Sequence, residues 1–370
     1  MRVLISGGGT GGHIYPALAI AQGLLKRQPD VTLLYVGIRN GMEADIVPAT
    51  GLEFAGISGR GLPRRLSAET LKTAAISLKA LWETKSILKR FHPDLVIGTG
   101  GYVSGPVVLT AALFGIPTLL HEQNAYPGVT NRILARIVKG VLLTFPESQA
   151  RMPGNAAKIQ VVGFPVRSEI GGVHRQEAAA FFGLRSDKRT VLVTGGSQGA
   201  RSLNQAMLTV AERLRDNQDI QLIWATGKAT YEETVEGLKK KNLRIDRPQW
   251  RIGEYIENMP QALGCADLVV GRAGAASLAE IMIAGKAAIL IPYPHAAANH
   301  QEYNAQALTD AGAARLILDK ELSGDGLWRE MNRLLNDGEA LQRMGQASRS
   351  LGQPEALNKI LDRCWQTAWR

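Results

Sequence analysis

VLISGGGTGGH, residues 3–13, places a short apolar strand directly before a glycine-rich turn, and a helical pattern follows the turn. VLVTGGSQGA, residues 191–200, repeats this arrangement in the second half of the chain. Glycine allows backbone N–H groups to approach a ligand closely, and the N-terminus of a helix favours negative charge. Each turn is therefore a candidate phosphate-binding site, and the pair predicts two domains of the same kind.

Apolar strand candidates alternate with helical stretches through both halves of the chain. This alternation is typical of parallel sheets covered by helices on both faces, so we predict an α/β fold with two doubly wound domains. The turn-prone segment Gly163–Arg167 is the expected link between them. The expected strands are residues 3–6, 32–36, 94–97, 118–120, 141–143, 159–162, 190–194, 220–225, 268–270, 288–291 and 315–318.

The composition limits the class of protein. The 370 residues are 45% hydrophobic, enough to fill the cores of two ordinary domains. Cys265 and Cys364, the two cysteines, have neither disulfide-framework nor zinc spacing, which fits a reducing compartment. The apolar N-terminal stretch is too short for a signal peptide, so we expect no secretion. Residues 95–120 carry no charge, but Pro106 and Pro117 favour strand, turn, helix and strand over a membrane span.

The net charge of +10 indicates anionic partners. Basic runs do not alternate with aromatic residues at a stacking period, so we expect no nucleic acid. After residues 62–66, a predicted helix combines apolar and basic residues, which suits an anionic membrane surface or the solvated face of an ordinary helix. The apolar set is Leu71, Ile76, Leu78, Leu81 and Trp82, and the basic set is Lys72, Lys79, Lys85, Lys89 and Arg90.

Three features of the sequence carry candidate chemistry. His13 follows the first turn, where an imidazole can act as a general base or merely cap the helix. Glu280, in the helix after Arg272, can accept two hydrogen bonds from a ribose diol or can simply be solvated. The polar cluster 299–304 follows a strand end, where ligands bind in parallel sheets. No Asp-x-Asp occurs, so we expect no metal, and helix dipoles and Arg167 are expected to meet phosphate charge.

Gly7, Gly9 and Gly12 also satisfy the dinucleotide spacing G-x-G-x-x-G, which keeps an oxidoreductase as an alternative. The predicted second strand ends without an acidic residue for the ribose, although Arg39 would suit the 2′-phosphate of NADP. Alternatively, the glycines serve only the packing of strand against helix.

Seven motifs run in order along nearly the whole chain: GGGTGGH (7–13), GTGGYVSGP (98–106), HEQN (121–124), GFPVR (163–167), GGSQGARSLN (195–204), RAGAASLAE (272–280) and NHQEYNA (299–305). Together they resemble the MurG family of bacterial cell-wall synthesis. The resemblance implies a GT-B architecture, with two Rossmann-like domains facing across a cleft. The implied domains are residues 1–163 on the acceptor and membrane side, 164–345 for UDP-GlcNAc, and a helix at 346–370 that returns to the first domain.

The resemblance also implies an activity and its residues. The family transfers GlcNAc from UDP-GlcNAc, with inversion, to the 4-hydroxyl of MurNAc in undecaprenyl-pyrophosphoryl-MurNAc-pentapeptide, without a cofactor. His13 is the first candidate for the general base and Glu122 the second. The implied donor contacts are Thr10, Gly11, Gly12, Asn124, Arg167, Ser197, Ile256, Ala275, Glu280 and Gln301. The implied acceptor contacts are His13, Tyr102, Glu122 and Asn124.

A lipid acceptor implies a peripheral protein on the cytoplasmic face of the bacterial inner membrane. Two other functions remain as alternatives. A GT-B enzyme acting on diacylglycerol would share the donor-binding residues, whereas a nucleotide-sugar sensor would need no general base. HEQN and GTGGYVSGP favour the peptidoglycan reaction over the diacylglycerol enzyme, and a sensor offers no role for the surroundings of His13 and Glu122.

Overall fold

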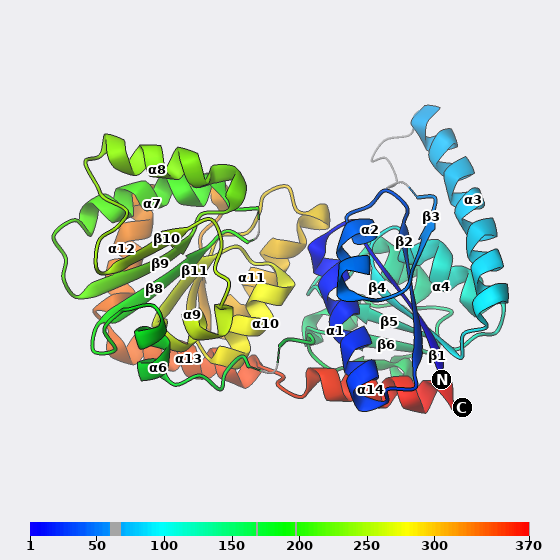
Figure 1. The fold of residues 1–370 in the computed structure, drawn as a ribbon. Coiled ribbons are helices and arrows are strands. Elements are labelled where there is room, and N and C mark those ends of the chain that lie inside the picture. Colours follow the sequence, from blue (N-terminus) through cyan, green and yellow to red (C-terminus); the bar gives the residue numbers. More distant parts are fainter. Residues whose placement is uncertain (60–67, 168, 197, 370) are drawn as a thin grey trace. The chain divides into compact units, whose positions relative to one another are not determined.

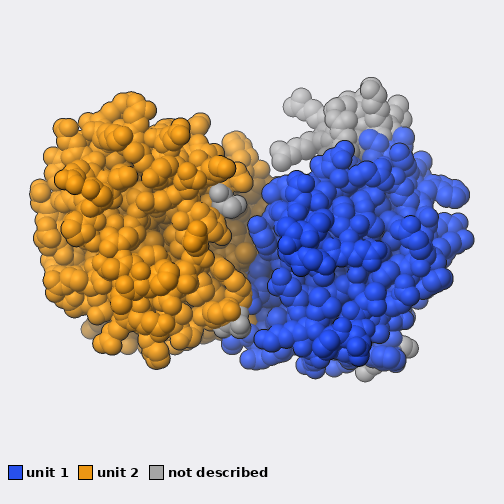
Figure 2. All heavy atoms as spheres, in the orientation of Figure 1, with its two compact units in different colours: residues 1–166, 354–370 blue, residues 167–353 orange. Residues whose placement is uncertain are grey.

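The computed structural model describes residues 1–59, 68–167, 169–196 and 198–369, with the backbone alone for 68–74. The chain forms two compact units (Figure 2). Unit 1 comprises Met1–Val166 and Pro354–Arg370, and unit 2 comprises Arg167–Gln353.

Unit 1 is built on a parallel sheet of seven strands in the order β3-β2-β1-β4-β5-β6-β7. The strands are β1 (Arg2–Gly7), β2 (Thr32–Ile38), β3 (Phe54–Ile57), β4 (Leu95–Gly100), β5 (Thr118–Glu122), β6 (Gly140–Leu143) and β7 (Ile159–Val161). The helices are α1 (Gly11–Arg27), α2 (Glu43–Ile46), α3 (Ala68–Phe91), α4 (Ser104–Leu113), α5 (Val129–Leu134) and α14 (Ala356–Ala368), with short 3₁₀ turns η1 (Pro48–Thr50), η2 (Pro146–Arg151) and η3 (Ala156–Lys158).

The two faces of this sheet bury different sets of side chains, because successive residues of a strand point to opposite sides. Val3 and Ile5 pack with α1 and α14, whereas Leu4 packs with α3, α4 and α5. The C-terminal helix α14 lies against α1 (Figure 1). Its approach is close: a Cβ on Gly23 of α1 would come within 3.0 Å of Leu357.

Unit 2 has a parallel sheet of six strands in the order β10-β9-β8-β11-β12-β13. The strands are β8 (Arg189–Thr194), β9 (Ile220–Ala225), β10 (Trp250–Gly253), β11 (Leu268–Gly271), β12 (Ala287–Leu290) and β13 (Ala314–Leu316). The helices are α6 (Arg175–Phe181), α7 (Arg201–Arg213), α8 (Tyr231–Lys240), α9 (Met259–Cys265), α10 (Ala275–Ala284), α11 (His300–Asp310), α12 (Gly324–Leu335) and α13 (Gly338–Leu351), with 3₁₀ turns η4 (Lys228–Thr230), η5 (Ala297–Asn299) and η6 (Asp319–Glu321).

The predicted alternation of strands and helices is confirmed, and all eleven predicted strands overlap observed ones. Sequence reasoning missed β3 and β10, each at the edge of its sheet. Edge strands need less apolar side-chain surface: β3 is mostly half-buried, and Arg251 and Gly253 interrupt the apolar pattern of β10. Within the described residues, no helix has both the length and the apolar composition needed to cross a bilayer.

The chain passes between the units twice. The first passage, at Val166–Arg167, lies within the turn-prone segment found in the sequence. The second lies at Gln353–Pro354, later than the predicted residue 346, because α13 continues without a break to Leu351, with Gly352 as its C-cap residue.

Candidate functional site

Both sheets have the strand order in which the chain starts at an inner strand and then builds outward to either side. Such an order creates a switch point, where the loops after two neighbouring strands diverge and leave a crevice for ligands. In unit 1 the switch point lies between β1 and β4, and in unit 2 between β8 and β11. The two glycine-rich turns identified in the sequence follow β1 and β8, so each lies at a switch point.

The first glycine turn is held from two sides. Gly9 has a φ of +80°, and Tyr102 from the loop after β4 lies so close that a Cβ on Gly9 would meet its ring at 3.0 Å. Below the turn, the fully buried carboxylate of Glu43 accepts hydrogen bonds from the backbone N–H groups of Gly9 and Ile38, at 3.2 and 2.9 Å. Burial, and then the charge of Glu43, raise the pKa of Tyr102, so its hydroxyl stays protonated. Sequence reasoning did not identify Glu43, which belongs to none of the recognised motifs.

His13 stands in the first turn of α1, and its ring is fixed by two acceptors. Nδ1 lies 3.1 Å from the carbonyl oxygen of Thr99 and 3.1 Å from Oε1 of Gln123. A carbonyl can only accept, so Nδ1 carries the proton and Nε2 of the neutral ring holds a lone pair. Gly100 leaves room for the ring, because a Cβ there would lie 2.8 Å from Nδ1.

Glu122 is used differently, although it lies next to Gln123 in sequence. Its side chain is buried, and its carboxylate oxygens accept hydrogen bonds from the loop that follows β5 and from α5. Oε1 accepts from the backbone N–H and the side-chain amide of Asn124, at 3.0 and 3.2 Å. Oε2 accepts from the N–H of Gly128 at 3.0 Å and from the amide of Asn131 at 2.8 Å. The carboxylate therefore organises the loop that carries Asn124.

The second glycine turn lies directly before α7 in unit 2. Gly196 and Gly199 both have φ values near +80°, at +82° and +81°. Gly199 packs against the loop after β9, where a Cβ would lie 2.2 Å from the carbonyl oxygen of Thr226. Asn204 of α7 donates from its side-chain amide to the same oxygen at 2.8 Å. Ser197, the predicted diphosphate contact, lies outside the described residues.

On the other side of the unit 2 switch point, Glu280 lies in the second turn of α10, and Ala275 is the first residue of that helix. Nη2 of Arg167 lies 3.3 Å from the Glu280 carboxylate, whose side chain is 20% exposed. Burial raises the pKa of Glu280, and the Arg167 guanidinium opposes this shift only in part. A carboxylate that has lost much of its water while keeping one cation is suited to accepting hydrogen bonds from a ligand.

The remaining predicted donor contacts lie on neighbouring elements of unit 2. Gln301, at the start of α11, accepts a hydrogen bond from the backbone N–H of Tyr293 at 2.9 Å, which ties α11 to the loop after β12. Ile256 is buried in the loop after β10. Arg272, after β11, is a structural residue: it pairs with Asp319, and both side chains are largely buried. No group of three His, Cys, Asp or Glu side chains suited to a metal occurs among the described residues.

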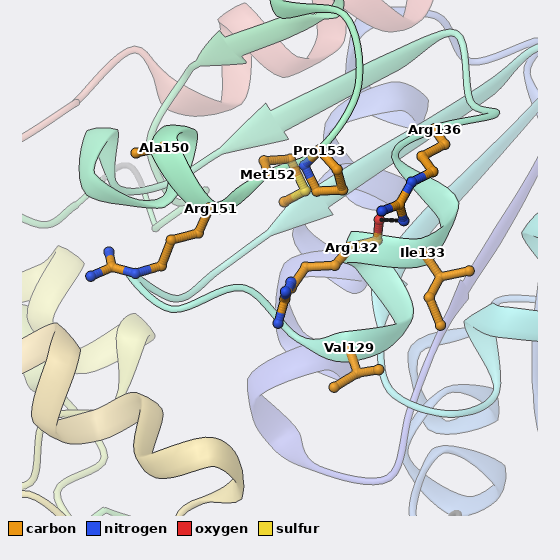
Figure 3. Close-up of a pocket in the computed structure, with 8 residues that line it drawn as sticks. All are labelled: Val129, Arg132, Ile133, Arg136, Ala150, Arg151, Met152 and Pro153. Atoms are coloured by element: carbon orange, nitrogen blue, oxygen red, sulfur yellow. Dashed lines mark hydrogen bonds between the residues drawn. The ribbon is translucent and has the colours of Figure 1, made fainter.

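A surface hollow of about 340 Å³ lies in unit 1, between α5 and the segment Ala150–Pro153 (Figure 3). Arg132, Arg136 and Arg151 give it positive charge, and the exposed side chains of Val129 and Ile133 form an apolar rim. None of its residues was predicted as a contact.

Comparison with known proteins shows that both halves of the chain match domains of one family. Residues 3–143 match the Glycosyltransferase family 28 N-terminal domain, and residues 190–360 match the Glycosyltransferase family 28 C-terminal domain. This chain belongs to glycosyltransferase family 28. The gap between the two matches, residues 144–189, contains the unit boundary at Val166–Arg167, so the first match falls in unit 1 and nearly all of the second falls in unit 2.

Relatives in family 28 match over the full length. A UDP-N-acetylglucosamine--N-acetylmuramyl-(pentapeptide) pyrophosphoryl-undecaprenol N-acetylglucosamine transferase of Desulfitobacterium hafniense (strain DSM 10664 / DCB-2) is 64% identical over 370 residues, covering 100% of both chains. A protein of the same name from Moorella thermoacetica is 48% identical and covers 98% of this chain and 97% of its own. The crystal structure of Acinetobacter baumannii MurG has a TM-score of 0.78 and 29% identity, covering 99% of each chain. The GT-B fold class predicted from the sequence is thus confirmed, as is the resemblance to the MurG family.

Proposed function

We propose that this chain transfers GlcNAc from UDP-GlcNAc to the 4-hydroxyl of MurNAc in undecaprenyl-pyrophosphoryl-MurNAc-pentapeptide, a reaction of peptidoglycan synthesis. The observation that carries the proposal is the similarity to a Desulfitobacterium hafniense protein named for this transfer. The two chains are 64% identical in an alignment that covers the full length of both. The two family 28 domains and the two switch-point sites provide the machinery that the reaction needs.

The reaction is inverting in this proposal, and His13 is the general base. The acceptor oxygen forms a bond to the anomeric carbon while the bond from that carbon to the diphosphate oxygen breaks. The hydroxyl proton passes to Nε2 of His13, and UDP leaves. This assignment is supported by the ring geometry, because the Nδ1 proton is committed to Thr99 and Gln123 and leaves Nε2 as the basic atom. A positioned base contributes about 10²- to 10⁴-fold to a rate.

Glu122 is the less suitable base. Four hydrogen bonds, three from the loop after β5 and one from α5, occupy its two oxygens, and abstracting a proton would require it to give up at least one. We assign it instead the role of holding Asn124, which together with Tyr102 we place in contact with the acceptor. Thr10, Gly11, Gly12 and Asn124 remain our candidates for contacts with the donor sugar.

Unit 2 is the donor-binding unit in this proposal. We assign Glu280 to the ribose hydroxyls, Gln301 to the donor sugar, and the backbone around Ile256 and Ala275 to the nucleotide. The N-terminus of α7, Ser197 and Arg167 would stabilise the charge that develops on the leaving diphosphate. We propose that these groups act without a metal ion.

An anionic membrane surface is the proposed partner of unit 1. Trp82 and Leu78 of α3 are 71% and 62% exposed, and Phe114, next to α4, is 51% exposed. The ammonium group of Lys85 lies 5.1 Å from the ring centre of Trp82 and 5.8 Å from that of Phe114. Exposed aromatic residues with adjacent cations suit the interface of an anionic leaflet. The predicted residues 62–66 and 71–72 lie outside the described side chains.

The surface hollow lined by Arg132, Arg136 and Arg151 adds a second cationic and apolar site on the same unit. Together these surfaces support a peripheral position on the cytoplasmic face of the inner membrane. There the enzyme can reach the sugar of the acceptor while the polyprenyl chain stays in the bilayer.

The deciding experiment measures transfer of radiolabelled GlcNAc from UDP-GlcNAc to a lipid-linked MurNAc-pentapeptide, with diacylglycerol as a parallel acceptor. We expect labelled product with the MurNAc lipid alone, and the same rate after EDTA treatment. Transfer only to diacylglycerol would refute the proposed acceptor. Loss of activity in EDTA, restored by a divalent ion, would refute the metal-independent mechanism while leaving the acceptor assignment intact.

A further inference from the structure

We infer that Gln123 is a positioning residue for the transfer reaction: its side-chain oxygen holds the His13 ring in the orientation and tautomer that make Nε2 the base. The expected effect on catalysis rests on the proposed function, but the hydrogen bonds that orient His13 do not depend on which acceptor the enzyme uses.

The orientation of the Gln123 amide follows from its neighbours. The side chain is buried, and its Nε2 donates to the backbone oxygen of His121 at 2.9 Å. The same nitrogen lies 3.0 Å from Nδ1 of His121. A carbonyl oxygen can only accept, so the amide nitrogen must face this backbone oxygen, and Oε1 is left to face Nδ1 of His13 at 3.1 Å.

His121 completes the chain of hydrogen bonds. Its ring is fully buried, and this burial lowers its pKa, so it stays neutral at physiological pH. Nδ1 of His121 accepts from Gln123, and therefore Nε2 carries the proton and donates to the carbonyl oxygen of Gly163 at 3.0 Å. The donor and the acceptor of each hydrogen bond are therefore determined along the series Gly163, His121, Gln123 and His13.

The chemical consequence appears when His13 takes up the acceptor's proton. The imidazolium then donates from Nδ1 to two oxygens, those of Thr99 and Gln123, and a hydrogen bond to a charged group is stronger than one to a neutral group. Two other titratable groups border Gln123: the neutral His121 and the Glu122 carboxylate, whose hydrogen bonds go to the other side of β5. The Gln123 oxygen therefore favours the protonated ring in the transition state.

The test compares two substitutions of similar size at this position. Gln123→Met removes the acceptor and keeps the volume, whereas Gln123→Glu keeps an oxygen and adds a negative charge. Gln22→Met, on the exposed face of α1, is the matched control. For the Met variant we expect kcat to fall roughly 10-fold, the loss of one hydrogen bond to a charged group, with the KM for UDP-GlcNAc unchanged. The acid limb of the kcat profile should move to lower pH in the Met variant and to higher pH in the Glu variant.

A second readout does not depend on catalysis. The ¹⁵N shifts of the His13 ring, assigned with His13→Ala, should report a proton on Nδ1 in the wild type and a larger share of the Nε2-protonated form in Gln123→Met. Unchanged ring shifts, or an acid limb that moves in the same direction in both variants, would overturn the inference. If Gln123→Met does not fold, the Glu variant decides, because an unmoved acid limb there would also overturn it. Absence of transfer in the wild type would instead refute the proposed function.

Discussion

Gly100→Ala tests how tightly the catalytic geometry is specified. Gly100 has a φ of +104°, and its added Cβ would lie 2.8 Å from Nδ1 and 2.9 Å from Cε1 of His13. To restore an ordinary contact of 3.4 Å, the His13 ring must retreat by roughly half an ångström, and a 1 Å misplacement costs about 100-fold in rate. We therefore expect kcat to fall roughly 10- to 100-fold. The left-handed backbone should also cost about 1–2 kcal/mol of folding stability.

Gly115→Ala separates the two effects. Gly115 lies in the same unit with a φ of +74°, and its added Cβ would meet no atom within 4 Å. It should lose a similar amount of stability, about 1–2 kcal/mol, and keep the wild-type kcat. The assay is steady-state GlcNAc transfer at saturating donor and acceptor, together with thermal unfolding of each variant. Equal kcat values for the two alanine variants would show that the position of the His13 ring does not limit the reaction.

Three further predictions address other parts of the molecule. Glu280→Gln should weaken UDP binding in calorimetric titration, yet raise folding stability at pH 7: burial raises the folded-state pKa of Glu280 above its ordinary value, so the cost of its ionised form grows as the pH rises from that ordinary value and is complete above the raised pKa. Unaltered UDP affinity would remove Glu280 from the donor site. Trp82→Glu should reduce cosedimentation with anionic vesicles, while Phe181→Glu, which adds the same charge at an exposed aromatic residue of unit 2, should not; equal binding by the two variants would contradict the membrane surface. Burial raises the pKa of Cys265 to about 11 and that of Cys364 to about 12, so iodoacetamide should label both thiols only after denaturation, and rapid labelling of the native protein would contradict their burial.

Much of the fold could be predicted because its determinants are local. Strands such as β1 and β8 are short apolar runs that lead directly into a glycine-rich turn, and both the run and the turn can be recognised from consecutive residues. Glu43 could not be predicted in this way. A Glu in a polar segment ordinarily indicates a solvated side chain, and its burial depends on the backbone N–H groups of Gly9 and Ile38, which only the folded sheet brings to it. The same applies to Gln123, whose partner His13 is 110 residues away in sequence.

The choice between His13 and Glu122 shows what three-dimensional structure adds to a recognised motif. In HEQN, successive side chains leave β5 toward opposite faces of the sheet. Leu119 packs on the face that α1 covers, and His121, two residues later, shares its direction; Gln123, directly after the strand, contacts the His121 ring and bonds to Nδ1 of His13. Leu120 packs on the other face, and Glu122 follows it toward α5 and Asn131. The motif thus contains two separate devices, one that orients the base and one that holds the Asn124 loop. A carboxylate committed to the second cannot also serve the first without a change of face, which is why we place proton transfer on His13.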